Sequence, residues 1–146
     1  MSTKELQEEI VNNMRKWQKV EDVSVKQCSE IIAKTKNPII KMIMEIIRAD
    51  SERHHKVEEI IADSFESSTI TLSPDELADV WDLIQKHIDM EKKAEAYARE
   101  SLEAMQKGPK WLVQEYLLHY LLEDEEKHDH MLESLEKIKS GMYPYA

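Results

Sequence analysis

Four polar side chains interrupt apolar stripes of the sequence at helical spacing, and they are Glu21, Glu91, Glu125 and His128. Glu21, for example, follows Trp17 by four residues and precedes Cys28 by seven, so the three would share one face of a helix. A lone carboxylate is costly to bury unless it is paired or binds a metal. Carboxylates together with imidazole suit iron or manganese, with zinc as an alternative. The spacing therefore predicts a metal site.

The distances of these residues from the nearest turn support that prediction. Glu21 and His54 lie 17 and 16 residues from Pro38. Glu91 and His128 lie 18 and 19 residues from the proline that begins the next hairpin's second helix. Equal distances from the turn of an antiparallel hairpin mean equal heights. Each hairpin is thus predicted to bring one Glu and one His to the same level.

The two hairpins also look like a diverged repeat. The second helix reads DSERH at 50–54, and the fourth reads DEEKH at 124–128. Aligning the two final histidines also matches Ile47 with Leu121. We therefore expect related arrangements in both halves of the chain.

The second helix offers two alternative pairs of metal ligands. Asp50 and His54 turn toward the isoleucine face and are four residues apart, which places them on one side of a helix. Glu52 and His55 lie on or beside a charged stripe that we interpret as the solvent face, made of Lys41, Glu45, Arg48, Glu52, Lys56, Glu59 and Asp63. We favour Asp50 and His54, with His54 more buried than Glu52, and Glu52 with His55 is the alternative.

Helix signals define the elements that would position these residues. Four long helices are predicted: from the capping box at 2–5 to about 36, from Pro38 to about 64, from the capping box at 73–76 to about 107, and from Pro109 to Gly141. The Ser- and Thr-rich segment 66–72 is expected to be a loop. Each helix carries an apolar stripe, so residues 1–146 are predicted to form one all-α domain, a four-helix bundle.

Composition narrows the classes of partner. The formal net charge of −10 disfavours binding to nucleic acid, because phosphate backbones repel an acidic surface. One cysteine, Cys28, cannot form an internal disulfide or a thiolate cluster. No apolar run reaches the roughly 18 residues of a membrane span, and the N-terminus lacks a signal-peptide core. We expect a cytoplasmic protein with no membrane partner.

In this layout the chain resembles the ferritin-like superfamily, and within it the rubrerythrin branch. That family takes one Glu from each of helices 1 and 3 and Glu-x-x-His from each of helices 2 and 4. Here Glu21 and Glu91 match the single glutamates, and Glu125 with His128 matches the fourth-helix motif. Ser51 stands where the helix 2 Glu should be. The resemblance implies a long crossover between helices 2 and 3, although a plain up-down bundle fits the site depths equally well.

The resemblance also implies a function. It suggests a non-haem iron or manganese carboxylate protein, with two iron ions as the family's usual complement, that oxidises ferrous iron or reduces peroxide. The chain lacks the four cysteines of a rubredoxin domain, so peroxide reduction would require an external electron donor. The alternatives are a metal-storing module and a metal-free helical scaffold or interaction protein.

The second helix is apolar over an unusually wide arc. Six residues of its first half are large and apolar: Ile39, Ile40, Ile43, Met44, Ile46 and Ile47. A helix in a monomeric bundle needs only one stripe. The excess predicts a homodimer or a higher homo-oligomer that buries this half of the helix.

Overall fold

The chain is all-α in the computed structural model, which describes residues 1–67 and 70–141. It contains five helices, α1 (Thr3–Lys34), α2 (Pro38–Glu66), α3 (Pro74–Ala78), α4 (Trp81–Met105) and α5 (Leu112–Lys139). No strand occurs in this described part. The predicted all-α class is confirmed. The last residues of the expected C-terminal tail, 142–146, lie outside the described residues.

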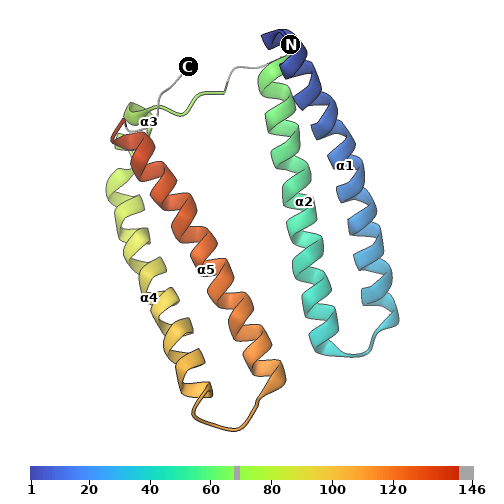
Figure 1. Ribbon diagram of the computed structural model, residues 1–146, viewed down its shortest axis with the longest axis vertical. Helices are drawn as coiled ribbons and strands as arrows, with labels where there is room; N and C mark the ends of the chain where they lie inside the picture. Colours follow the sequence, from blue (N-terminus) through green and yellow to red (C-terminus); the bar gives the residue numbers. More distant parts are fainter. Residues whose placement is uncertain (68–69, 142–146) are drawn as a thin grey trace. The chain divides into compact units, whose positions relative to one another are not determined.

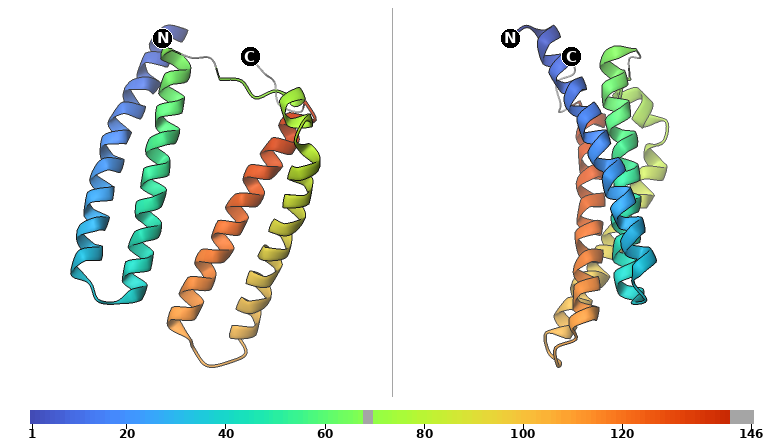
Figure 2. Two further views of the ribbon diagram at one scale, coloured as in Figure 1. Left: turned by 180° about the vertical axis from the view of Figure 1, so that it is seen from behind. Right: turned by 90° about the vertical axis from the view of Figure 1, so that its right-hand side faces the viewer.

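The contacts divide the chain into two compact units, Met1–Ile70 and Thr71–Ala146. We call them hairpin 1 and hairpin 2. In hairpin 1, α1 and α2 pack against each other as antiparallel helices (Figures 1 and 2). Both helix starts follow the sequence: Ser2 and Glu5 form a capping box, and the Asn37 side chain accepts hydrogen bonds from the amides of Ile39 and Ile40 just after Pro38.

In hairpin 2, α4 packs along α5, and the short α3 contacts both. The predicted capping box at Ser73 and Glu76 is present. The prediction of one continuous helix from this point was wrong, because the helix breaks at Asp79 and Val80. Val80 adopts φ −120° and ψ 5°, and its amide donates to Leu77 in a tighter turn. Leu77 is buried, so the short α3 is fixed by its own apolar contact.

The α4–α5 turn is longer than the sequence suggested. Helix α5 begins at Leu112, whereas the proline at 109 predicted an earlier start. The Trp111 ring lies so close to Gly108 that a Cβ there would come within 2.6 Å of it. Any larger residue at 108 would therefore require the indole ring to move. At the far end of α5, Gly141 adopts a φ of 72°, as expected for a helix-terminating glycine.

The seam of hairpin 1 is made of small and polar side chains. On α1 the buried residues are Val11, Gln18, Glu21 and Cys28; on α2 they are Ser51, Glu58 and Ala62. Their spacings of three, four and seven are those of a coiled-coil seam. The larger apolar residues beside this seam, including Trp17, Ile47 and Val57, are exposed. Hairpin 1 alone therefore covers only part of each predicted apolar stripe.

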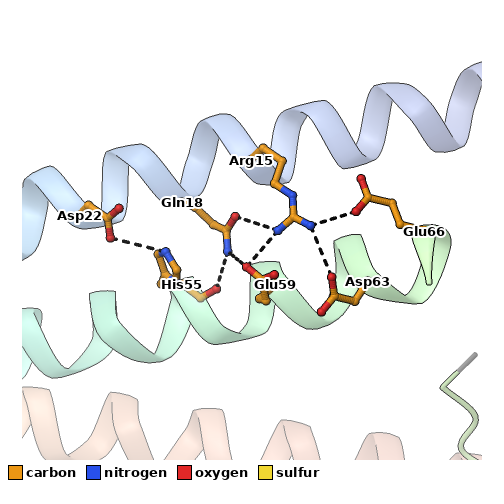
Figure 3. Close-up of polar contacts among 7 residues, drawn as sticks. All are labelled: Arg15, Gln18, Asp22, His55, Glu59, Asp63 and Glu66. Atoms are coloured by element: carbon orange, nitrogen blue, oxygen red, sulfur yellow. Dashed lines mark hydrogen bonds and ion pairs between the residues drawn. The ribbon is translucent and has the colours of Figure 1, made fainter. Parts of the chain in front are cut away.

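A network of polar contacts joins α1 to the end of α2 (Figure 3). The Arg15 guanidinium forms ion pairs with Glu59 at 2.9 Å, Asp63 at 3.4 Å and Glu66 at 3.0 Å. Gln18 donates to the His55 carbonyl oxygen and to Glu59. Glu59 and Asp63 therefore face α1, so that part of the charged stripe was wrongly assigned to the solvent face.

Candidate metal site

Three of the predicted ligands meet in hairpin 2. Glu91 comes from α4, and Glu125 and His128 come from α5, three residues apart on one face. One potential ligand atom from each lies within 4.8 Å of the other two. His128 Nδ1 is 3.2 Å from Glu91 Oε2 and 3.6 Å from Glu125 Oε2. Among the described residues, this is the one group of three acidic, histidine or cysteine side chains gathered so tightly.

The two carboxylates of this group are largely buried. The side chains of Glu91 and Glu125 are 12% and 21% exposed. Glu125 Oε2 is buried and has no hydrogen-bond partner. A buried carboxylate oxygen without a donor is uncommon, because its desolvation is not compensated. A cation bound between these side chains would supply that compensation.

The two carboxyl groups perturb each other's pKa in opposite directions. Hydrogen bonding between them lowers the pKa of Glu91, and His128 lowers it further. The same hydrogen bond, with burial, raises the pKa of Glu125. Closely spaced carboxylates shift each other's pKa in this way, because the charge of one disfavours the charge of the other. A cation bound between them would offset that repulsion.

Further polar contacts fix the orientation of the ligands. His87, one turn before Glu91 on α4, places its Nε2 2.8 Å from Glu91 Oε1. His128 Nε2 lies 3.6 Å from Asp124, which also pairs with Lys127 at 2.7 Å. Glu91 is therefore contacted by one histidine from each helix, His87 from α4 and His128 from α5. Contacts at both ring nitrogens orient His128.

A second carboxyl pair lies beside the first, between Glu95 on α4 and Asp129 on α5. Hydrogen bonding to Glu95, with burial, raises the pKa of Asp129 to about 6. The pKa of Glu95 is lowered by Asp129 and then by Arg99. Arg99 also contacts Glu126 at 2.8 Å. This pair is supported by a nearby guanidinium, whereas none of the contacts described for Glu91, Glu125 and His128 involves Lys or Arg.

In hairpin 1 the structure brings together the other predicted Glu–His pair. His54 Nδ1 lies 3.3 Å from Glu21 Oε1. Glu21 is buried, whereas the His54 side chain is 57% exposed. In both hairpins, Nδ1 of the histidine thus faces a glutamate carboxylate, as the repeat suggested.

The remaining predictions for α2 have mixed outcomes. Asp50 is exposed, and its side chain forms no hydrogen bond or ion pair with the described residues. His54 and Glu52 are both exposed, so the expected contrast in burial is not seen. Of these two, only His54 contacts a carboxylate in the described part of the chain. His55, from the alternative pair, lies 3.5 Å from Asp22.

Two residues near the Glu–His pairs were missed by the sequence analysis. They are His87, four residues before Glu91, and Glu58, four residues after His54. Spacing of four places side chains on one helix face, so this signal was present in the sequence. Glu58 was not found because it lies outside the apolar stripe and beside the charged one.

No known protein family, curated protein or solved structure matches the chain. No helix in the described part of the chain has the length and apolar character needed to cross a bilayer. Conclusions about function therefore depend on the chemistry of the site. Two carboxylates and one imidazole, among them a buried carboxylate oxygen that accepts no hydrogen bond, fit an iron or manganese ion.

Proposed function

We propose that this protein binds iron or manganese through Glu91, Glu125 and His128. The observation that carries the proposal is the convergence of three ligand atoms within 4.8 Å of one another. They come from two helices whose packing sets their positions. Rigid elements hold a ligand set more accurately than loops do.

The type of ligands favours these metals. Carboxylates suit hard cations such as manganese, and imidazole suits iron and other transition metals. A mixed set of two carboxylates and one imidazole is therefore compatible with both manganese and iron. Zinc remains an alternative, because affinity alone does not select among such metals. Three protein ligands leave coordination positions for water or a substrate.

The protein's own groups would do three things at this site. Glu91 and Glu125 would bind the cation with their carboxylates. His128 would bind through Nδ1, while Asp124 holds the opposite ring nitrogen. His87 would fix Glu91 from its own helix. Bound iron would supply one-electron redox chemistry, which is the basis for proposing an oxidoreductase that acts on ferrous iron or peroxide.

We further propose that the two hairpins belong to one ferritin-like four-helix bundle. Support comes from the large apolar side chains that both hairpins leave exposed, such as Trp17 and Val20 in hairpin 1 and Leu83 and Met90 in hairpin 2. Exposed apolar area of this extent favours burial against another surface. Peroxide reduction by such a bundle would require an external electron donor.

The test begins with metal content. Protein purified after growth in iron-rich medium should carry iron, measured by elemental analysis, and the apoprotein should accelerate the oxidation of ferrous iron by oxygen. Glu91→Gln should lower metal affinity by more than about 100-fold, since it removes a direct ligand and not only a supporting contact. Wild-type protein without bound metal after such growth would contradict the proposal.

The matched control is Glu100→Gln. Glu100 lies on the same helix and is exposed. It should leave metal content unchanged. Equal metal content in both variants would show that the ion binds elsewhere. Metal retained by wild type without any gain in the rate of ferrous oxidation would favour a storage role.

A further inference from the structure

Glu58 is the most buried acidic residue among those described in hairpin 1. It is 4% exposed, and both of its carboxylate oxygens are buried without a hydrogen-bond partner. Burial raises the pKa of this carboxyl group, and repulsion from Glu21 raises it further. None of the contacts that hold hairpin 1 together accounts for a carboxylate at this position.

Packing does not explain the choice of residue either. In the alignment of His54 with His128, the residue that matches Glu58 is Leu132. Leu132 is half-buried on α5, so hairpin 2 accommodates an apolar side chain at this position. An apolar residue at 58 would avoid the desolvation of a carboxylate. Packing alone therefore does not explain the carboxylate at 58, whereas a bound ligand would explain it.

The neighbours of Glu58 are themselves suited to a cation. Glu21, on α1, is buried and contacts His54 at 3.3 Å. His54 precedes Glu58 by four residues, so their side chains share one face of α2. The charges of Glu21 and His54 are the two that act most strongly on the Glu58 carboxylate. Two buried carboxylates and one accessible imidazole thus occupy one stretch of the hairpin.

Hairpin 2 holds the same types of residue, but the second carboxylate lies at a different position. In hairpin 2 the extra carboxylate, Glu125, lies three residues before its histidine. The matching position in hairpin 1 is Ser51, which is buried and hydrogen-bonded to Ser24 at 2.8 Å. Hairpin 1 instead has its extra carboxylate four residues after the histidine. Both hairpins therefore hold two glutamates and one histidine, in different order along the second helix.

We propose that hairpin 1 carries a second divalent-cation site, formed by Glu21, His54 and Glu58. One divalent cation balances the two buried carboxylates, and the exposed edge of His54 gives it a path of entry. These three side chains are less tightly gathered than the ligands of hairpin 2, so joint binding of one ion requires them to come closer together. This site goes beyond the proposed function, because it needs no ion in hairpin 2.

The test counts Mn²⁺ ions bound to the full chain, from the loss of the free-ion signal in electron paramagnetic resonance. Wild type should bind two ions. Glu58→Gln and Glu91→Gln should each bind one, and the double variant none. Glu45→Gln changes an exposed glutamate on α2 and should bind two. Glu58→Gln with wild-type stoichiometry would overturn the second site, whereas Glu91→Gln with wild-type stoichiometry would overturn the proposed function alone.

Thermal unfolding gives an independent readout. In the presence of EDTA, Glu58→Gln should unfold at a higher temperature than wild type, because it removes a buried carboxylate without a partner. Added Mn²⁺ should raise the unfolding temperature of wild type more than that of Glu58→Gln. A structural role for Glu58 predicts the opposite result in EDTA. Loss of both ions in either single variant would also overturn the proposal, since the sites would then not be independent.

Discussion

Glu91 lies between two histidines, His87 on its own helix and His128 on α5. The contact with His87 is the shorter of the two, at 2.8 Å against 3.2 Å. A carboxylate held at both oxygens has one orientation, and groups that orient metal ligands contribute measurably to affinity. His87 is therefore a positioning residue of the candidate site.

His87→Gln should weaken metal binding by about tenfold while leaving the number of bound ions unchanged. The reason is that Glu91 keeps its carboxylate but loses one of the contacts that orient it. Titration of the apoprotein with Co²⁺, followed by its visible absorption, measures both quantities.

His119→Gln is the matched control for that experiment. His119 also pairs with a glutamate one turn away on its own helix, Glu115, at 3.9 Å. It should bind Co²⁺ as wild type does. A similar loss of affinity in both variants would mean that removing any histidine weakens binding through overall charge.

The sequence predicted that Glu91, Glu125 and His128 would meet in hairpin 2 because the relevant signals are local. Helical spacing puts Glu125 beside His128, and equal distance from the turn puts Glu91 opposite them. Glu58 was missed for a physical reason. Helix α2 meets α1 through Ser51, Glu58 and Ala62, and such a seam of small and polar residues has no hydropathy signal.

Among the elements, helix starts were predicted better than helix interiors. Ser2, Asn37 and Ser73 all cap helices as expected, because a cap depends on a few adjacent residues. The break between α3 and α4 was not predicted, because no Gly or Pro marks it. Leu77, just before the break, is buried, and a tertiary contact of this kind is not contained in a local pattern.

The turn between α4 and α5 gives a prediction of its own. In Gly108→Ala the new Cβ would lie 2.6 Å from the Trp111 ring, so the indole must move. We expect a red shift of tryptophan emission, with a stability loss of about 1 kcal/mol or less because the turn is at the surface. Fluorescence of a variant that keeps Trp111 as its sole tryptophan measures the shift.

Gly141→Ala is the control for the turn. Gly141 has a positive φ, but no atom of the residues that the structure describes lies within 4 Å of the place that an added methyl group would take. The substitution therefore strains the backbone without displacing a ring. It should reduce stability and leave the emission of Trp111 unchanged. Emission that is unaffected in Gly108→Ala would contradict the close packing of the turn.

At the scale of the whole molecule, the wide apolar arc of α2 still predicts self-association. Ile40 and Ile47 on this arc are 43% and 42% exposed. A symmetric dimer would bury such residues against their own copies. Light scattering should therefore give a mass of twice 17.2 kDa at high concentration.

Ile40→Glu should convert that dimer to a monomer, because burying two symmetry-related carboxylates is unfavourable. The control is Gln85→Glu, which adds the same charge at an exposed polar residue of α4 and should leave the dimer intact. A wild-type mass of 17.2 kDa at every concentration would rule out the predicted dimer.

The single thiol of the chain is buried in the seam of hairpin 1, where Cys28 is 2% exposed. An alkylating reagent can reach it only when α1 and α2 separate, so its rate of modification measures how often hairpin 1 opens. The natural sequence thus contains its own reporter of local unfolding, with no label to introduce. A cation that bridges α1 and α2 would slow alkylation, while one bound only in hairpin 2 would not do so directly.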